Sequence, residues 1–237
     1  MDVIAIIPAR GGSKRIPRKN IADFHGKPVL AWAIESAKAA KSVKRVFVNT
    51  DDEEIREIAL RYGAEVPFLR PAALAQDTMG IEPVLLDALA WLKGHEGYEP
   101  HAIALLMPTN PMRTPEAIDE AVALFEKTGA DSVVAVTEAK ANNNPHWILR
   151  KHADGRVTLF DGTPLTAIRT RSQDLPPTYS RTDIAYILKP SNLRQDPPNL
   201  YGDKVELFVQ DESFEGDINT PEDWASTYDK FRRLRLP

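Results

Sequence analysis

The sequence predicts a single α/β domain with a Rossmann-like, mostly parallel sheet and helices on both of its faces. Two observations carry this prediction: short apolar runs alternate with segments of helical periodicity, and polar loops follow several of the apolar runs. Strand and helix in regular alternation favour right-handed crossovers and a parallel sheet. With 237 residues, of which 43% are hydrophobic, the chain is long enough to bury one substantial core.

The expected strands are short and apolar, as buried parallel strands usually are. They cover residues 3–7, 43–48, 103–107, 132–136 and 205–209. The expected helices carry apolar residues three and four positions apart, which places these residues on one face. They cover residues 29–40, 51–62, 81–93, 114–127 and 221–233.

Residues typical of helix ends mark several of these boundaries. Thr50-Asp51-Asp52-Glu53 puts a cap and acidic residues at one helix start. Thr114-Pro115-Glu116 does the same at another and adds a proline at the first helical position. Gly63 and Gly129 fall where two helices should end.

The alternation weakens between residues 138 and 189. Shorter extended pieces are separated there by turns such as Asn142-Asn143-Asn144-Pro145 and Asp154-Gly155. The chain shows no internal repeat, and its prolines are scattered among loops, so residues 1–237 are expected to form one domain.

Composition excludes several classes of protein. A formal net charge of -4 argues against general nucleic-acid binding, because a reader of a polyanion normally carries a basic face. The chain has no cysteine, which rules out disulfides, thiolate metal ligands and a cysteine nucleophile. No apolar stretch is long enough for a signal peptide or a membrane span, so we expect a soluble, cytoplasmic protein.

The loop after the first strand is the most informative part of the chain. Five basic residues crowd between positions 10 and 19, and Gly11 and Gly12 would let backbone amides approach an anion closely. A triphosphate would satisfy several cations and amides at once. A solvated basic turn explains the composition equally well, and neither common phosphate-binding fingerprint is present.

Other polar loops are expected to meet this one. An open parallel sheet binds ligands at the carboxyl ends of its strands. Residues 10–20, 49–52 and 108–113 all follow expected strands. The sequence therefore predicts one crevice built from these three segments.

The run from Val3 to Asn20 resembles the signature of the acylneuraminate cytidylyltransferase family, and more distantly that of 3-deoxy-manno-octulosonate cytidylyltransferases. Later segments extend the resemblance in family order over nearly the whole chain: Asn49 to Ile55, Leu69-Arg70-Pro71, Ala75 to Thr78, Pro108 to Arg113, Gln173 to Pro176 and Asp217 to Asp223.

The resemblance implies a specific reaction. A hydroxyl of a 2-keto-3-deoxy sugar acid attacks the α-phosphorus of CTP and yields a CMP-sugar, of the kind used in polysaccharide biosynthesis, and pyrophosphate. Positioning and charge neutralisation dominate such catalysis, with Mg²⁺ (or Mn²⁺) as the cofactor. The resemblance also implies a homodimer, in which residues 138–189 form the dimerisation element and border the acceptor site.

The resemblance further implies which residues contact the nucleotide. They are Ala9, Arg10, Gly11, Gly12, Ser13, Lys14, Lys19, Asn20, Arg70, Asp77, Thr78, Pro108 and Thr109, with Arg10, Lys14, Lys19 and Asp217 as catalytic residues. Arg15 and Arg18 could equally be surface charges. A surface ion pair is the alternative for Arg70, and a helix cap is the alternative for Asp77-Thr78.

The acceptor and metal sites match the family less closely. The implied acceptor residues are Met107, Asn110, Arg113, Arg171, Gln173, Tyr179 and Arg181. Met107 stands where the family often has glutamine, and Thr182-Asp183 stands where sialic-acid enzymes commonly have Asn-Gly. The order around Gln173 favours pseudaminic or legionaminic acid as the nonulosonic acceptor.

The implied metal ligands are Asp217 and Asn219, where the family has two aspartates. Asn219 brings no negative charge, so either Asp217 and the phosphate oxygens of the substrate hold the ion adequately, or Asp211, Glu212 or Glu215 compensates. A helix cap could also explain the segment without a metal. Two alternatives stay open: the same chemistry on another acid, such as an octulosonate or a phosphonate, or a nucleotide-binding protein with impaired catalysis.

Overall fold

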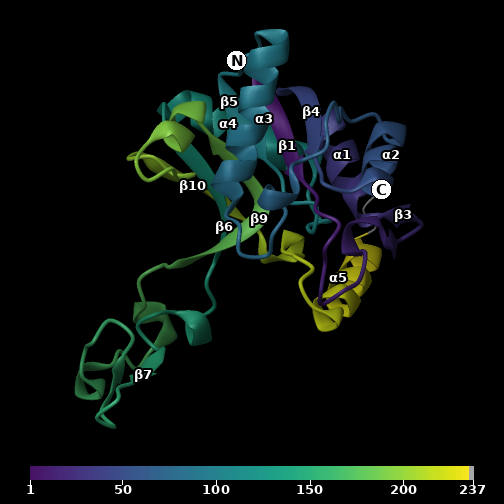
Figure 1. The fold of residues 1–237 in the computed structure, drawn as a ribbon. Coiled ribbons are helices and arrows are strands. Elements are labelled where there is room, and N and C mark those ends of the chain that lie inside the picture. Colours follow the sequence, from purple (N-terminus) through teal and green to yellow (C-terminus); the bar gives the residue numbers. More distant parts are fainter. Residues whose placement is uncertain (235–237) are drawn as a thin grey trace.

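The computed structural model describes residues 1–234 and is built around a six-stranded sheet (Figure 1). The strand order is β10-β6-β9-β5-β1-β4. Strand β1 pairs in parallel with β4 and β5, and β6 pairs in parallel with β10. The predicted mostly parallel sheet is therefore confirmed. Its strands are β1 (Val3–Pro8), β4 (Val43–Asn49), β5 (Ala102–Leu105), β6 (Ser132–Glu138), β9 (Tyr179–Leu188) and β10 (Val205–Gln210).

Strand β9 is the element that the sequence did not reveal. It runs antiparallel between β5 and β6, so that Ile187 lies opposite both Ala104 and Val133. Only its second half is a buried apolar run, because its first three residues are exposed. The stretch 138–189 thus ends inside the central sheet.

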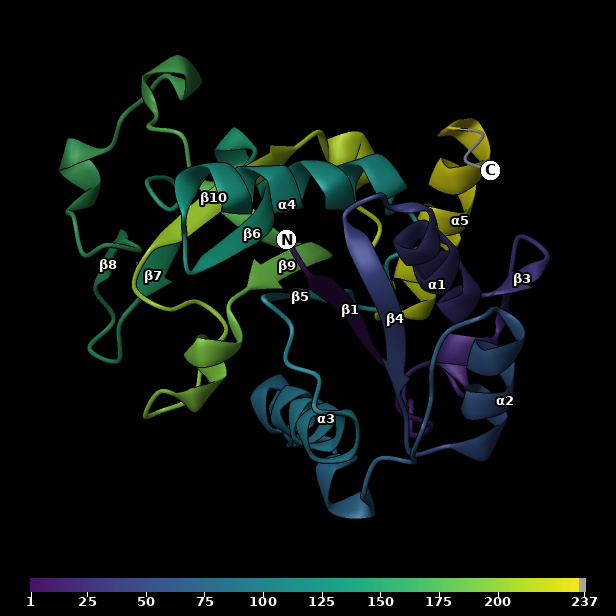
Figure 2. The same ribbon diagram turned by 90° about the horizontal axis from the view of Figure 1, so that it is seen from above.

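Helices cover the two faces of the sheet (Figure 2). One face carries α1 (Val29–Ala39), α2 (Glu53–Arg61) and α4 (Pro115–Thr128), whose apolar residues pack on alternate residues of β1. The other face carries α3 (Ile81–Glu96), which packs on Ile4 and Ile6. Burial of both strand faces explains why these strands are almost wholly apolar.

The helix ends follow the sequence signals. Asp52 accepts a hydrogen bond from the Ile55 amide at 3.0 Å and caps α2. Thr114 likewise caps α4 by accepting from the Ala117 amide at 3.2 Å. Gly129 follows α4 with a φ of 63°, a left-handed conformation that suits glycine.

The last helix, α5 (Pro221–Leu234), packs against a short hairpin of β2 (Asp23–Phe24) and β3 (Lys27–Pro28). Phe24 and Phe231 form the centre of this small core, and Ile218 packs into it. Because Ile218 is fully buried, it anchors its neighbours Asp217 and Asn219 beside the end of β5.

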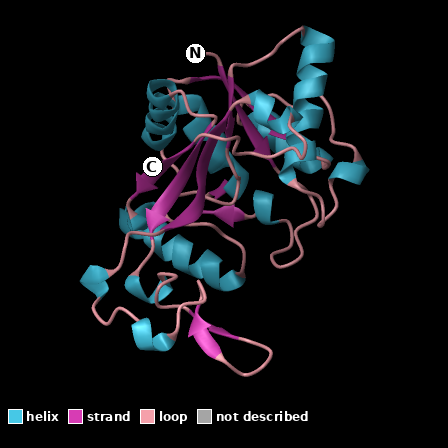
Figure 3. Ribbon diagram, turned by 90° about the vertical axis from the view of Figure 1, so that its left-hand side faces the viewer, coloured by secondary structure: helices cyan, strands magenta, loops and turns pink. Residues whose placement is uncertain are grey.

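Residues 139–178 form an arm that projects from the sheet, between β6 and β9 (Figures 1 and 3). It holds a hairpin of β7 (Leu149–Lys151) and β8 (Val157–Leu159) together with short 3₁₀ turns. Across the described residues, no helix combines the length and the apolar composition needed to cross a bilayer.

Candidate active site

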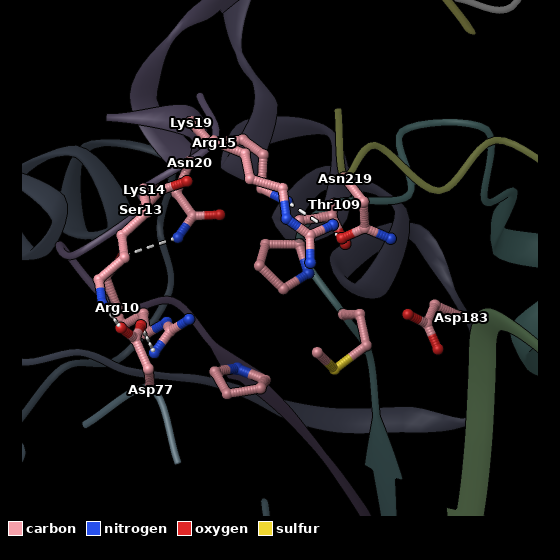
Figure 4. Close-up of a pocket in the computed structure, with 13 residues that line it drawn as sticks. Arg10, Ser13, Lys14, Arg15, Lys19, Asn20, Asp77, Thr109, Asp183 and Asn219 are labelled. Atoms are coloured by element: carbon pink, nitrogen blue, oxygen red, sulfur yellow. Dashed lines mark hydrogen bonds and ion pairs between the residues drawn. The ribbon is translucent and has the colours of Figure 1, made fainter. Parts of the chain in front are cut away.

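A pocket of about 430 Å³ opens at the carboxyl ends of β1 and β5 (Figure 4). The loop after β1 forms one wall, the turn after β5 forms the floor, and β9 and the segment before α5 complete the rim. The lining residues are Pro8, Arg10, Ser13, Lys14, Arg15, Lys19, Asn20, Asp77, Met107, Pro108, Thr109, Asp183 and Asn219.

Two cations of the loop wall converge on one carboxylate. Arg10 lies 2.7 Å from Asp77, and Lys14 also pairs with Asp77. The hydrogen bond from Lys14 lowers the pKa of Asp77, with further contributions from the charges of Lys14 and Arg10. Asp77 therefore neutralises part of the loop's charge, and an entering triphosphate would compete with it for the same donors.

Fixed contacts shape the backbone of this loop. The side-chain amide of Asn20 donates to the Arg10 carbonyl at 2.9 Å, and the backbone amide of Gly11 donates to Asp51 Oδ1 at 3.0 Å. Arg18 points away from the pocket, where it pairs with Asp52 and Glu54. The segment 49–52 thus supports the loop and does not line the pocket.

Lys19 links the loop to the segment before α5. Its Nζ donates to the Ile218 carbonyl and lies 3.5 Å from Asn219 Oδ1. Burial lowers the pKa of Lys19, and the nearby Asp217 carboxylate opposes that shift. An ammonium group held in this way is ready to bind an anion that enters the pocket.

Asp217 lies at the edge of the pocket. Thr109 Oγ1 donates to Asp217 Oδ1 at 2.6 Å, and the Asn219 amide donates to the other carboxylate oxygen. Asp217 lines a neighbouring hollow, whereas Asn219 lines both that hollow and the main pocket.

These oxygens fit a metal ion that is bound mainly through a nucleotide. Residues 1–234 contain no group of three His, Cys, Asp or Glu side chains arranged to hold a metal by themselves. Asp217, Asn219 and Thr109 are all oxygen donors, and Mg²⁺ needs only one or two carboxylates when phosphates and waters complete its shell. The donor set is therefore compatible with Mg²⁺ carried by a triphosphate.

Two of the three carboxylates considered as compensation for Asn219 have other contacts. Asp211 accepts from the Ser213 amide at 2.8 Å, and Glu212 lies 2.9 Å from Lys140. Glu215 shares the neighbouring hollow with Asp217. The additional carboxylate that faces the main pocket is Asp183 on β9.

The β9 wall is organised by a buried arginine. Arg113 donates to the carbonyls of Met107 and Asp183 at 2.8 and 2.7 Å, and also to that of Ile184. Burial lowers the pKa of Arg113 to about 10. Asp183, half-buried, accepts from the Tyr186 hydroxyl at 3.0 Å, and burial raises its pKa.

A smaller hollow of about 240 Å³ adjoins the main pocket and shares Arg10 and Asp77 with it. Arg70 lines this hollow, with only 4% of its side chain exposed and its Nη2 3.7 Å from Asp51. Within the described residues, Nε and Nη2 of Arg70 have no hydrogen-bond partner. Arg70 is thus a buried donor group beside the site and not an ordinary surface ion pair.

The structure gathers most of the predicted nucleotide residues but separates the predicted acceptor residues. Thr78 does not line the pocket, and the Ala9 amide donates to Asn49 within the fold. Asn110 and Arg113 are buried beneath the pocket.

Four of the predicted acceptor residues lie outside the pocket. Arg171 and Gln173 lie on the arm, where Arg171 pairs with Asp174. Tyr179 begins β9, and Arg181 donates to the Tyr201 hydroxyl. Of the predicted acceptor set, Met107 alone lines this pocket.

Three pocket residues, Pro8, Arg15 and Asp183, are not among the predicted site residues. The sequence allows Arg15 to be a surface charge, yet Arg15 lines the pocket. Asp183 was noted only as a departure from the family pattern. Asp183 could have been predicted as a pocket residue if β9 had been recognised as a central strand, because β9 forms part of the pocket rim.

Comparison with known proteins agrees with this geometry. A family model described as cytidylyltransferase matches residues 4–195. This chain belongs to that cytidylyltransferase family. The match covers the loop after β1, the turn after β5 and β9, so every residue that lines the pocket except Asn219 lies within the matched region.

The cytidylyltransferase has relatives over nearly its whole length. It is 32% identical to the CMP-N,N'-diacetyllegionaminic acid synthase of Legionella pneumophila over 231 residues, which cover 96% of this chain and 95% of that protein. It is 32% identical to the pseudaminic acid cytidylyltransferase of Campylobacter jejuni over 223 residues, covering 94% and 93%.

A solved structure shares the fold at lower identity. The CTP complex of CMP:2-keto-3-deoxy-manno-octonic acid synthetase has a TM-score of 0.73 and 16% identity, with 100% of both chains covered. At this identity the likeness concerns the fold of the cytidylyltransferase alone.

Proposed function

We propose that this cytidylyltransferase transfers CMP from CTP to a hydroxyl of a nonulosonic acid, such as sialic, pseudaminic or legionaminic acid, and releases pyrophosphate. The observation that carries the proposal is the cationic pocket at the ends of β1 and β5, where Arg10, Lys14 and Lys19 face the oxygen donors around Asp217. The names of the full-length relatives support the nonulosonic class of acceptor.

Each part of the pocket has a task in this reaction. Arg10, Lys14 and Lys19 bind the triphosphate and stabilise the charge that develops on the departing pyrophosphate. The buried donors of Arg70 suit the carbonyl oxygen of cytosine, since a guanidinium presents its N–H groups in a fixed plane. Asp217 and Asn219 would hold Mg²⁺ with the phosphates, and that ion would withdraw charge from the α-phosphorus.

We also propose a homodimer formed through the arm. Leu149 and Phe160 on the arm are 55% and 51% exposed, and Ile148, Leu165 and Ile168 are exposed as well. Apolar groups gathered on one projecting segment are typical of a protein interface. Arg171 and Gln173 lie away from the pocket of their own chain, which supports an acceptor role in the pocket of a partner copy. The cytoplasmic location stays a prediction from the sequence.

The test is pyrophosphate release from each of the four nucleoside triphosphates with Mg²⁺, against a panel of sialic, pseudaminic, legionaminic and octulosonic acids. We expect release with CTP and a nonulosonic acid. Release only with the octulosonic acid would contradict the nonulosonic acceptor. If no acid supports release while CTP binds by calorimetry, the result favours either an acceptor outside this panel or the impaired-binder alternative, and Asn219→Asp should then be assayed for recovery of turnover.

A further inference from the structure

Asp183 places a carboxylate in a pocket that must receive two anionic substrates. Figure 4 shows its side chain extending from β9 into the pocket, across from Arg10 and Asp77. One carboxylate oxygen accepts from the Tyr186 hydroxyl at 3.0 Å. Tyr186 is only 7% exposed, so this oxygen is hydrogen-bonded to a buried side chain. The second oxygen remains for a ligand.

The cations around Asp183 are directed elsewhere. Arg113 gives its donors to backbone carbonyls, among them the carbonyl of Asp183 itself. Arg181 donates to the Tyr201 hydroxyl, and Lys19 donates to the Ile218 carbonyl. Within residues 1–234, no cationic side chain forms an ion pair or a hydrogen bond with the Asp183 carboxylate, whose pKa is raised by burial and by the charge of Asp217, although the charges of Arg113 and Arg181 lower it.

A positively charged group on the acceptor would compensate this charge. A half-buried carboxylate without a cationic partner is costly, and it repels the carboxylate of a sugar acid that faces it. A hydroxyl of the acceptor could donate a hydrogen bond but would leave the charge in place. A protonated amine supplies both the donor and the opposite charge, and charge-assisted bonds of this kind are the stronger ones.

We infer that Asp183 binds a protonated amino group of the acceptor and so selects nonulosonic acids that carry a free amine. The inference rests on the proposed cytidylyl transfer and specifies its substrate. N-acylation removes both the charge and an N–H donor and adds bulk beside β9, so an acylated counterpart should be a poor substrate. Met107, the apolar neighbour on the pocket floor, suits the carbon skeleton next to that amine.

The experiment compares matched pairs of nonulosonic acids that differ only in a free or an N-acetylated amine, with the amine at each ring or chain position in turn. We measure kcat/KM with CTP and Mg²⁺ for the wild type, Asp183→Asn and Asp183→Gly. The wild type should prefer one free-amine acid over its acetylated partner by about 10- to 100-fold, the range expected for a charged hydrogen bond. Asp183→Asn should lower kcat/KM for the free-amine acid and leave kcat/KM for the acetylated acid unchanged, so that the preference disappears. Asp183→Gly should raise kcat/KM for the acetylated acid.

Several outcomes would overturn the inference. If Asp183→Asn lowers turnover of both members of a pair by the same factor, the carboxylate acts on a group that both acids share, as a general base would. Equal turnover of free and acetylated acids by the wild type would contradict the proposed amine contact. Absence of turnover with every amine-bearing acid would contradict it as well. Calorimetry with CTP distinguishes these results from failure of the proposed function. If the wild type does not bind CTP, both the proposed cytidylyl transfer and the amine contact are contradicted.

Thermal melts of the variants guard against a folding artefact. If Asp183→Asn unfolds, Asp183→Ser is assayed in its place. A purely structural role beside Arg113 would lower stability without changing the ratio of the two kcat/KM values. An unchanged ratio in a folded variant therefore contradicts the inference.

Discussion

Thr109 and Asp217 are joined by a hydrogen bond of 2.6 Å, although 108 residues separate them in the sequence. Thr109 follows β5, and Asp217 precedes α5. The bond fixes the carboxylate at the edge of the pocket, and the buried Ile218 holds the same segment from behind. The position of the proposed metal ligand is thus determined by packing as well as by chemistry.

Asp217→Ala should abolish metal-dependent turnover while the fold is retained. The substitution removes the carboxylate that is proposed to hold Mg²⁺ with the phosphates, whereas the cap of α5 depends on Asp223, which accepts from the Thr220 amide at 2.8 Å. Asp217 accepts two side-chain hydrogen bonds, and the loss of each costs only about 1 kcal/mol of unfolding free energy. The measurements are pyrophosphate release and binding of Mn²⁺ in the presence of CTP, followed by electron paramagnetic resonance. Asp211→Ala is the matched control, and normal turnover by Asp217→Ala would exclude the proposed role.

Lys19→Ala should weaken CTP binding by about 10- to 100-fold, as loss of a charged hydrogen bond predicts. Calorimetry measures the affinity directly. Lys204→Ala is the control, because Lys204 donates to the Thr128 carbonyl far from the pocket. Unchanged affinity in a folded Lys19→Ala protein would contradict the assignment of the phosphate loop.

Lys19 also predicts proton uptake when CTP binds. Burial lowers the pKa of Lys19, so the free protein loses this charge at a lower pH than an ordinary lysine does. Phosphate oxygens favour the charged form and raise that pKa again. CTP binding should therefore take up protons on the alkaline side and weaken as pH rises through the free pKa. Calorimetry in buffers of different ionisation enthalpy measures the uptake, which Lys19→Arg should eliminate. Uptake that persists in Lys19→Arg would assign it to another group.

The two loop glycines should respond differently to alanine. A Cβ at Gly11 would lie 2.6 Å from Asp52 Oδ2, whereas a Cβ at Gly12 would meet nothing within 4 Å. Gly11→Ala should thus displace Asp52, weaken the α2 cap and lower the unfolding free energy by about 1–2 kcal/mol. Gly12→Ala should keep its stability in urea unfolding and weaken CTP binding, because the new methyl group would hinder a phosphate. Equal effects of the two substitutions on stability would contradict this account.

The arm makes a prediction about assembly. Replacing both Leu149 and Phe160 with aspartate should yield a monomer in analytical ultracentrifugation, because charges would replace exposed apolar groups at the proposed interface. Val209→Asp is the matched control, since Val209 is 51% exposed on the edge strand β10. A wild-type monomer, or a dimer that survives the double substitution, would argue against an interface formed by the arm.

The sequence predicted the fold well where local signals agreed with the tertiary structure. Strand β1 is apolar on every residue because both of its faces are covered, and the caps at Asp52 and Thr114 mark their helices directly. The sequence pattern did not reveal strand β9 because its first half is polar, its first three residues are exposed, and its pairing with β5 and β6 is non-local. For the same reason, the sequence pattern does not predict Asp183 as a site residue.

The sequence pattern also could not predict the direction in which a side chain points. Arg113 and Asn110 follow a strand, as site residues should, yet they turn inward: Asn110 Oδ1 accepts from the Met112 amide at 3.1 Å. Composition alone cannot distinguish a cation that faces substrate from one that satisfies backbone carbonyls. Burial and hydrogen bonding decide this, and both depend on the folded chain.

Arg113 therefore gives a test that separates the sequence prediction from the structure. If Arg113 binds the acceptor, Arg113→Met should raise KM for the acid and leave stability nearly unchanged. The structure predicts the opposite, because the substitution leaves the carbonyls of Met107, Asp183 and Ile184 without their donor. Each unsatisfied buried carbonyl costs about 1–3 kcal/mol, so urea unfolding should show a loss of roughly 3 kcal/mol or more. Arg181→Met is the control, since Arg181 is exposed and should cost little. A stable Arg113→Met protein with impaired acceptor binding alone would restore the prediction from the sequence.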